Sequence, residues 1–144
     1  MAVSAKAYGP ALAAMANGSI NWTTDTIKVA LCTSAYTPDQ DAHDFFNDVT
    51  NEVTGTGYTA GGATLGSKTS AYTGGTNTTA LDAADTTWSA STITARYAII
   101  YKSTGTAATS PLIGWVDFGA DVVSSAGNFT ITWDAGGLFT LNTP

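Results

Sequence analysis

Charged residues are scarce in this sequence of 144 residues, at 11 % of the total, which is about half the usual share. The positive ones number five, against eleven aspartates and glutamates, and the net charge is −6. They are Lys6, Lys28, Lys68, Arg96 and Lys102. Because these cations are scattered, no basic stripe is available to hold phosphate groups, and nucleic acid is not expected as a partner.

Long apolar runs are also lacking. No stretch approaches the roughly 18 apolar residues of a membrane-spanning helix, so we expect no membrane partner. The first ten residues lack a charged segment followed by an apolar one, so no signal peptide is predicted. The sequence has one cysteine, Cys32, which cannot form an internal disulfide. It lies in a strand-like run and is predicted to be a small buried side chain. A single unpaired cysteine suits synthesis in a reducing cytoplasm.

Threonine, serine, glycine and alanine take the place of the missing charges. Apolar and aromatic residues are present at normal levels, at 44 % and 10 %, so the low charge does not indicate disorder. Short apolar runs separated by glycine are typical of all-β sandwiches. We therefore predict a single domain over residues 1–144, an antiparallel β-sandwich of jelly-roll or immunoglobulin-like type, with one or two short helices near the N-terminus.

The central prediction is an antiparallel hairpin over residues 93–118. Its outer runs, ITARYAIIYK and PLIGWVDF, are rich in β-branched and aromatic residues, and the linking STGTAATS is small and polar. Placing Lys102 opposite Pro111 sets Arg96 against Asp117, and this ion pair favours the register. The other pairs of that register are Tyr101–Leu112, Ile100–Ile113, Ile99–Gly114, Ala98–Trp115, Tyr97–Val116 and Ala95–Phe118. Both faces are apolar, which predicts a central strand pair covered on both sides.

Shorter elements flank this hairpin. Residues 10–17 are predicted to form a helix that begins at Pro10 and stops before Gly18. Residues 1–18 therefore either dock on a neighbouring subunit as an arm or cover one end of the domain. Strands are predicted over 27–32, 52–54, 63–65, 129–133 and 138–141. A second short helix is predicted from Pro38 to Asp44 or Phe46, a flexible loop over 70–78, and a turn over 124–127.

The acidic segment that contains the only histidine is the first candidate for chemistry. His43 is a candidate catalytic base, but no serine or threonine stands in a Gly-x-Ser-x-Gly pattern, and a surface histidine beside carboxylates explains the residue as well. The segment also holds Asp39, Asp41, Asp44 and Asp48. Asp39-Gln-Asp41 begins like a calcium loop, yet Asp44 stands where the loop requires glycine and no closing glutamate follows. A solvated turn is the preferred interpretation.

Three further patterns have a chemical and a structural interpretation. Gly55–Ala60 matches the letters of a dinucleotide fingerprint, but no strand–helix context surrounds it, so turns with positive φ are preferred. Asp82 and Asp85 are a candidate carboxylate pair, or a turn between strands. The tryptophans are candidates for stacking on sugars, although core packing is preferred. They are Trp22, Trp88, Trp115 and Trp133. We therefore predict no catalytic, metal or cofactor-binding residue, and a binding or structural module rather than an enzyme.

Several longer strings carry a resemblance to a known group of proteins. They are GSINW at 18–22, DTIKVAL at 25–31, YTPDQD at 36–41, NEVTGTGYTAGG at 51–62 and TITARYA at 92–98. Over nearly its whole length the sequence resembles small virion proteins of tailed bacteriophages. The resemblance implies a structural protein located in the virion after synthesis in the host cytoplasm.

Within the virion, the resemblance favours a capsid decoration protein. Such a protein would be a homo-oligomer, with a trimer favoured, bound to the major capsid protein or another virion protein. The alternatives are a tail or fibre-associated protein, or a carbohydrate-binding module that uses exposed tryptophans and residues 39–48. Residues 1–17 and 103–110 are the candidate contact elements, since binding concentrates at termini and loop tips. We expect removal of residues 1–17 to leave a folded domain.

Overall fold

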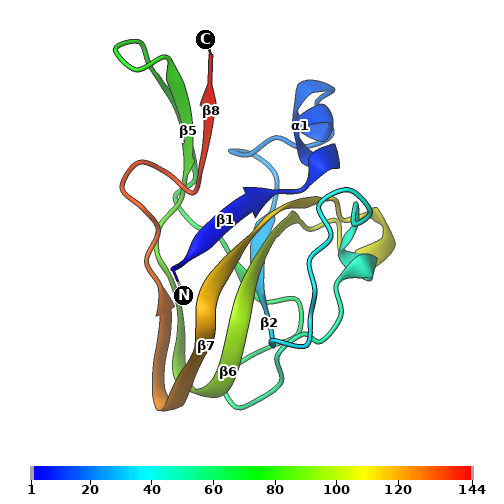
Figure 1. The fold of residues 1–144 in the computed structure, drawn as a ribbon, viewed down its shortest axis with the longest axis vertical. Coiled ribbons are helices and arrows are strands. Elements are labelled where there is room, and N and C mark those ends of the chain that lie inside the picture. Colours follow the sequence, from blue (N-terminus) through cyan, green and yellow to red (C-terminus); the bar gives the residue numbers. More distant parts are fainter. Residues whose placement is uncertain (1, 144) are drawn as a thin grey trace.

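The computed structural model describes residues 2–143, which are mostly β and form two antiparallel sheets and one short α-helix (Figure 1). The first sheet has the order β1-β7-β6-β2-β3 and the second the order β4-β5-β8. The strands of the first sheet are β1 (Ser4–Ala7), β2 (Ile27–Cys32), β3 (Ala63–Thr64), β6 (Thr86–Lys102) and β7 (Leu112–Ile131). Those of the second are β4 (Thr69–Thr73), β5 (Thr78–Asp82) and β8 (Phe139–Asn142). Helix α1 spans Gly9–Ala16, and short 3₁₀ turns span Phe46–Asp48 and Ala107–Thr109. The predicted mostly-β antiparallel class is confirmed.

The long hairpin of β6 and β7 lies in the middle of the first sheet, between β1 and β2, as predicted. Neighbouring residues Ile99 and Ile100 are both fully buried although their side chains point to opposite faces. The face of Ile100 packs against a large cluster that includes Ile113. The face of Ile99 packs against a second cluster with Trp115. Two-sided burial of the hairpin is therefore achieved within one chain.

The register of the hairpin differs from the prediction by one residue. Tyr101 faces Leu112 as predicted, but Ile100 then faces Gly114, and Tyr97 faces Asp117. A β-bulge at Ile113 causes the shift. Because both faces of the hairpin are apolar, the hydrophobic pattern does not distinguish the two registers. The predicted ion pair of Arg96 and Asp117 still forms, across a diagonal.

The N-terminal segment closes the second face of this sheet. Strand β1, which was not predicted, pairs antiparallel with β7. Tyr8 is 1 % exposed, its ring centroid lies 4.6 Å from that of Trp115, and its hydroxyl lies 2.9 Å from the hydroxyl of Tyr36. The predicted helix is present, with Pro10 in its first turn. Because Tyr8 and β1 belong to the packed body, we now expect removal of residues 1–17 to destabilise the fold, against the expectation from the sequence.

Other local predictions failed where tertiary pairing overrides the sequence. Residues 38–44 form turns rather than a helix, because the Asp39 carboxylate accepts the backbone N–H groups of Asp41 and Ala42 at 3.0 Å. The predicted loop over 70–78 is instead the β4–β5 hairpin. Strand β7 runs through the predicted turn at 124–127 with only a shift in register. Residues 52–54 contribute a single bridge from Glu52 to Cys32.

Trp115 gives a test of the second face. It is 7 % exposed and contacts Tyr8. We expect Trp115→Ala to lower the free energy of unfolding by about 3–5 kcal/mol, because the cavity beneath β1 cannot collapse fully. Urea unfolding measures this. Trp133→Ala is the control, since Trp133 is only half-buried, and it should cost clearly less. A cost below about 1 kcal/mol for Trp115→Ala would contradict the packing described here.

Candidate functional site

His43 is held in a chain of hydrogen bonds with two tyrosines. Its Nδ1 lies 3.0 Å from the hydroxyl of Tyr36 and accepts the backbone N–H of Asp39 at 3.3 Å. Burial raises the pKa of Tyr36 to about 12, and burial raises that of Tyr8 further. Both phenols therefore stay protonated and able to donate. This chain of groups ties the start of α1 to the 36–44 segment, and His43 serves as its outer end.

The aspartates of the acidic segment cap turns. Asp39 accepts two backbone N–H groups, and Asp48 accepts those of Asp44 at 3.0 Å and Phe45 at 3.4 Å. These backbone hydrogen bonds lower the pKa of both carboxyl groups. Within residues 2–143, no three or more His, Cys, Asp or Glu side chains gather into a group that can hold a metal ion. The carboxylates shape the loop, which agrees with the preferred interpretation of a turn.

Glu52 organises the glycine-rich segment, a role that the sequence analysis missed. Its Oε1 accepts the hydroxyl of Tyr58 at 2.7 Å and the backbone N–H of Gly61 at 2.6 Å. The Tyr58 oxygen in turn accepts the N–H of Leu31 at 2.9 Å. The one available signal was that Glu52 is the only glutamate of the sequence. The cluster fastens the 52–62 segment onto β2.

The glycines of that segment allow backbone to approach backbone. Gly62 has a φ of +73°, and a Cβ there would lie 1.9 Å from the carbonyl oxygen of Val29. Gly55 approaches Thr92 and Gly57 approaches Ser91 in the same way, both on β6. The interpretation of these glycines as turn residues with positive φ is confirmed. The glycines that match the letters of a dinucleotide fingerprint are therefore explained by close packing of this segment against β2 and β6.

Gly62→Ala tests this packing. We expect a loss of about 2–4 kcal/mol in the free energy of unfolding, because the methyl group meets rigid backbone and the φ is unfavourable. Gly66→Ala is the matched control, since a Cβ there meets nothing within 4 Å and its φ is not in the left-handed region. Thermal or urea unfolding of both variants gives the comparison. Equal stabilities would show that the segment is not held against β2.

The tryptophans proposed as sugar platforms lie mostly inside the molecule. Trp22, Trp88 and Trp115 are 5 %, 6 % and 7 % exposed, so none offers a ring face to a sugar. Trp133 is half-buried, and its indole N–H donates to the carbonyl of Ala84 at 3.1 Å. Asp85 accepts the backbone N–H of Trp133, which fixes the turn between β5 and β6. Cys32 is fully buried, and burial raises its pKa to about 12.

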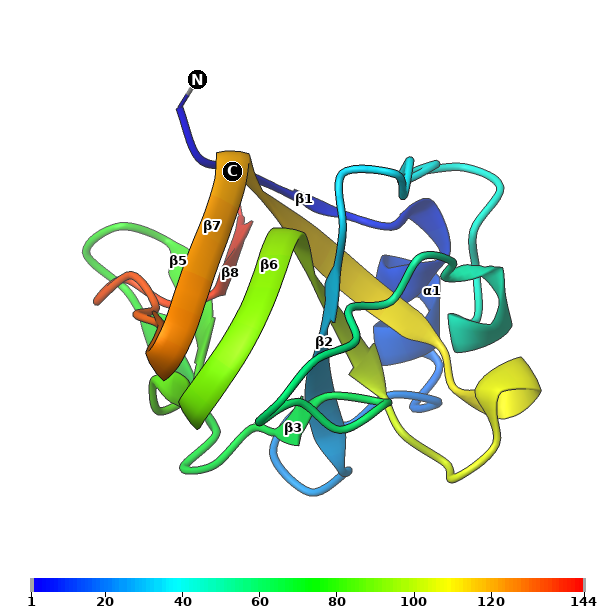
Figure 2. The same ribbon diagram turned by 90° about the horizontal axis from the view of Figure 1, so that it is seen from below.

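Strand β7 bends sharply near its middle (Figures 1 and 2). On β6, Tyr97 faces Asp117 and Ala95 faces Val122. The single residue between them, Arg96, therefore lies opposite residues 118–121 of β7, which form a bulge. Gly119 within this bulge has a φ of +82°. Asp117 accepts the N–H of Gly119 at 2.8 Å and the guanidinium of Arg96. One carboxylate therefore fixes both sides of the bend.

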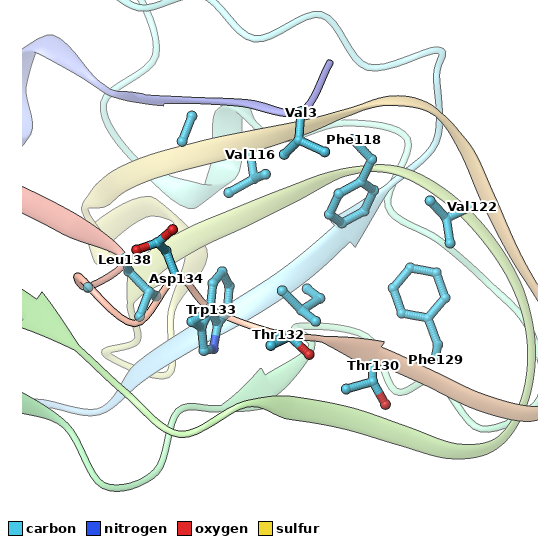
Figure 3. A pocket seen from close by; sticks show the side chains of 13 residues that line it. Val3, Val116, Phe118, Val122, Phe129, Thr130, Thr132, Trp133, Asp134 and Leu138 are labelled. Carbon is cyan, nitrogen blue, oxygen red and sulfur yellow. The ribbon is translucent and has the colours of Figure 1, made fainter. Parts of the chain in front are cut away.

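An apolar groove of about 430 Å³ lies inside the bend (Figure 3). Its walls come from both halves of β7, from the segment that leads into β8, and from the residues around β1. The lining residues are Val3, Ala5, Val116, Phe118, Val122, Phe129, Thr130, Ile131, Thr132, Trp133, Asp134, Gly137 and Leu138. Val3 and Val122 are 65 % and 42 % exposed. The groove has the size and lining to receive a small apolar group.

A second hollow, also about 430 Å³, separates α1 from the loop between β6 and β7. It is lined by Pro10, Ala13, Ala14, Asn17, Ser19, Phe45, Lys102, Thr104, Thr109 and Pro111. We name this surface the α1–loop face. The structure thus brings together the two segments that the sequence predicted as contact elements, residues 1–17 and 103–110.

The loop on this face is braced by its own hydroxyl groups. Ser110 is 2 % exposed, donates to the carbonyl of Thr106 at 2.8 Å and accepts the N–H of Thr104 at 3.0 Å. Lys102 is bound by the carboxylate of Asp25 at 3.0 Å and the carbonyl of Ser19 at 2.7 Å. The face is therefore pre-ordered, and its nearest cation is already paired.

No protein-family model, curated protein or solved structure matched the chain. Within residues 2–143, no helix has the length and apolar character needed to cross a membrane. The surfaces described above and the motifs of the sequence therefore carry the functional proposal.

The carboxylates at the turns and the bend predict how stability depends on pH. The ion pair with Arg96 lowers the pKa of Asp117, as backbone hydrogen bonds lower those of Asp39 and Asp48. Because the unfolded chain then binds protons more readily, this stability is complete above the ordinary pKa of about 3.9 and is lost as the pH falls through the folded values. Urea unfolding between about pH 7 and pH 2 should show this decline.

Asp117→Asn should lower stability at neutral pH and flatten the decline, so that its curve meets that of the original chain in acid. Asp121→Asn, an exposed position on the same strand, is the control and should leave the curve unchanged. Parallel curves for Asp117→Asn and the original chain would contradict the role of this carboxylate.

Proposed function

We propose that this chain is a structural protein of a tailed-bacteriophage virion, and that it decorates the outer surface of the capsid. The α1–loop face is the observation that carries the proposal. Two segments far apart in the sequence, each expected to make contacts, flank one hollow. The partner is the major capsid protein or another virion protein.

The motif strings behind the resemblance support a role based on shape. Glu52 and Gly62 fasten the glycine-rich string at 51–62 to β2. Tyr36, which begins the string at 36–41, hydrogen-bonds to Tyr8. Two of the strings also supply one partner of each salt bridge found within residues 2–143: Asp25 binds Lys102, and Arg96 binds Asp117. Side chains used in this way stabilise the fold, which suits a structural protein that acts through the shape of its surface.

The chemistry of the α1–loop face suits docking on another protein. Ala13, Thr104 and Thr109 are exposed, small and uncharged. Because the loop is already ordered by Ser110, little conformational entropy is lost when a partner covers it. A rigid, neutral surface of this kind can bury against a capsid without leaving an unpaired charge.

We further propose a β-sandwich arrangement of the two sheets, of jelly-roll or immunoglobulin-like type. Leu81 of the second sheet belongs to the same buried cluster as Ile100 and Ile113 of the first, which supports this arrangement. The protein is proposed to act as a homo-oligomer in the virion. The trimer favoured by the resemblance stays a prediction.

A tail or fibre-associated protein is the alternative within the virion. Copy number separates the two, since a decoration protein approaches the copy number of the major capsid protein and a tail part is far rarer. No observation favours the carbohydrate-binding module, because three of the four tryptophans are buried.

Ala13→Glu tests the proposed surface. Capsids that lack this protein are mixed with purified variants and sedimented, and the bound fraction is measured. We expect binding to weaken about tenfold or more, which corresponds to about 1.4 kcal/mol, because a charge is placed in the hollow. Ser125→Glu, at an exposed position on β7 outside the hollow, is the control. Undiminished binding of a folded Ala13→Glu variant would reject the α1–loop face as the contact surface.

A further inference from the structure

Strand β4 is an edge of the second sheet in the part of the chain that the structure describes. It pairs with β5 on one side. All five of its residues, Thr69–Thr73, are exposed. The backbone groups on its other side therefore face outward, where they form a template for another strand.

This edge lacks the features that usually prevent pairing. Its sequence, TSAYT, contains no charge and no proline, and its register with β5 is continuous from Thr69–Asp82 to Thr73–Thr78. Natural edges are commonly protected by lysine, proline, bulges or very short length. The edges of the first sheet have such features, since β1 carries Lys6 and β3 has two residues. The other edge of the second sheet, β8, is also uncharged but has four residues, so β4 is the longest unprotected edge among residues 2–143.

We propose that β4 pairs antiparallel with β4 of a second copy of this chain, about a two-fold axis at Ala71. Thr69 then lies opposite Thr73 of the partner subunit, and Ser70 opposite Tyr72 of the partner subunit. Threonine pairs of this kind are favourable across antiparallel strands. An isologous contact of this form is the commonest in oligomers.

The absence of charge along β4 lowers the electrostatic cost of pairing with a second copy. Each chain carries a net charge of −6, so two copies approach most easily along an uncharged segment. The five residues of β4 provide such a segment, and no like charges meet in the proposed register.

Tyr72 supports the same contact. It is 59 % exposed, and its hydroxyl donates to the side-chain oxygen of Asn77 at 3.0 Å. Tyr72 pairs with Thr79, which pairs with Leu141, so these residues share a face of the sheet. In the proposed dimer the two copies of Tyr72 are diagonal neighbours, within reach of aromatic side chains. The contact would cover the most exposed aromatic side chain among residues 2–143.

A cysteine cross-link tests the proposed axis on the free protein. Ala71→Cys places two thiols directly opposite one another, whereas native Cys32 is fully buried. Thr140→Cys is the matched control, because Thr140 lies in the same row of the sheet on the opposite edge and is exposed. We expect Ala71→Cys to form a disulfide-linked dimer at least about tenfold faster under mild oxidation, because pairing raises the local thiol concentration.

Sedimentation adds a second test. The original chain should be a dimer. Ala71→Lys and Ala71→Glu alone should each be monomers, and their equimolar mixture should be a dimer again, because opposite charges then meet across the axis. A monomeric original chain, equal cross-linking of the two cysteine variants, or a trimer that Ala71→Lys leaves intact would overturn the proposal.

This contact is independent of the capsid. A chain that dimerises through β4 but fails to bind capsids would leave this inference standing and reject the proposed function. A chain that is a monomer when free in solution and still binds capsids would do the reverse.

Discussion

The bend of β7 depends on one carboxylate. Asp117 binds the guanidinium of Arg96 and the N–H of Gly119, and between these two contacts β7 accommodates the extra residues of its bulge. Without the bend the second half of the hairpin could not turn back, Phe118 could not lie near Phe129, and the groove would have no inner wall. Because bulges re-aim strands, this contact shapes the groove and directs the chain toward β8.

The hairpin also needs cover on both faces, and the chain supplies it from distant segments. One face receives Leu81 and Val53, and the other receives Tyr8 and Tyr36. The N-terminal segment is therefore part of the body and also presents α1 beside the 103–110 loop. The same packing that completes the core thus creates the proposed capsid-contact surface, so stability and the proposed binding would both depend on the docking of β1.

The sequence predicted elements best where local chemistry and tertiary pairing agree. The α1 helix followed from Pro10 and Gly18, and the central hairpin from its runs of β-branched residues. The predictions failed where a segment had little preference of its own. Residues 70–78 are threonine- and glycine-rich, and they form the end of β4, a turn and the start of β5 only because β5 pairs with both β4 and β8. Glu52 was missed as an organising residue because its partners, Tyr58 and Gly61, are fixed only by the path of the loop.

By itself, the sequence determined the antiparallel β class, the central hairpin, the pairing of Arg96 with Asp117 and the conformational role of the glycines. These depend on local preference, on charge and on backbone freedom, which act over a few residues or across one hairpin. The tertiary structure decided the register within that hairpin, the docking of Tyr8, the meeting of α1 with the 103–110 loop and the open edge at β4. Most of these features depend on contacts between segments far apart in the chain. An apolar residue does not by itself specify which apolar surface will cover it, so the sequence pattern could not predict these contacts.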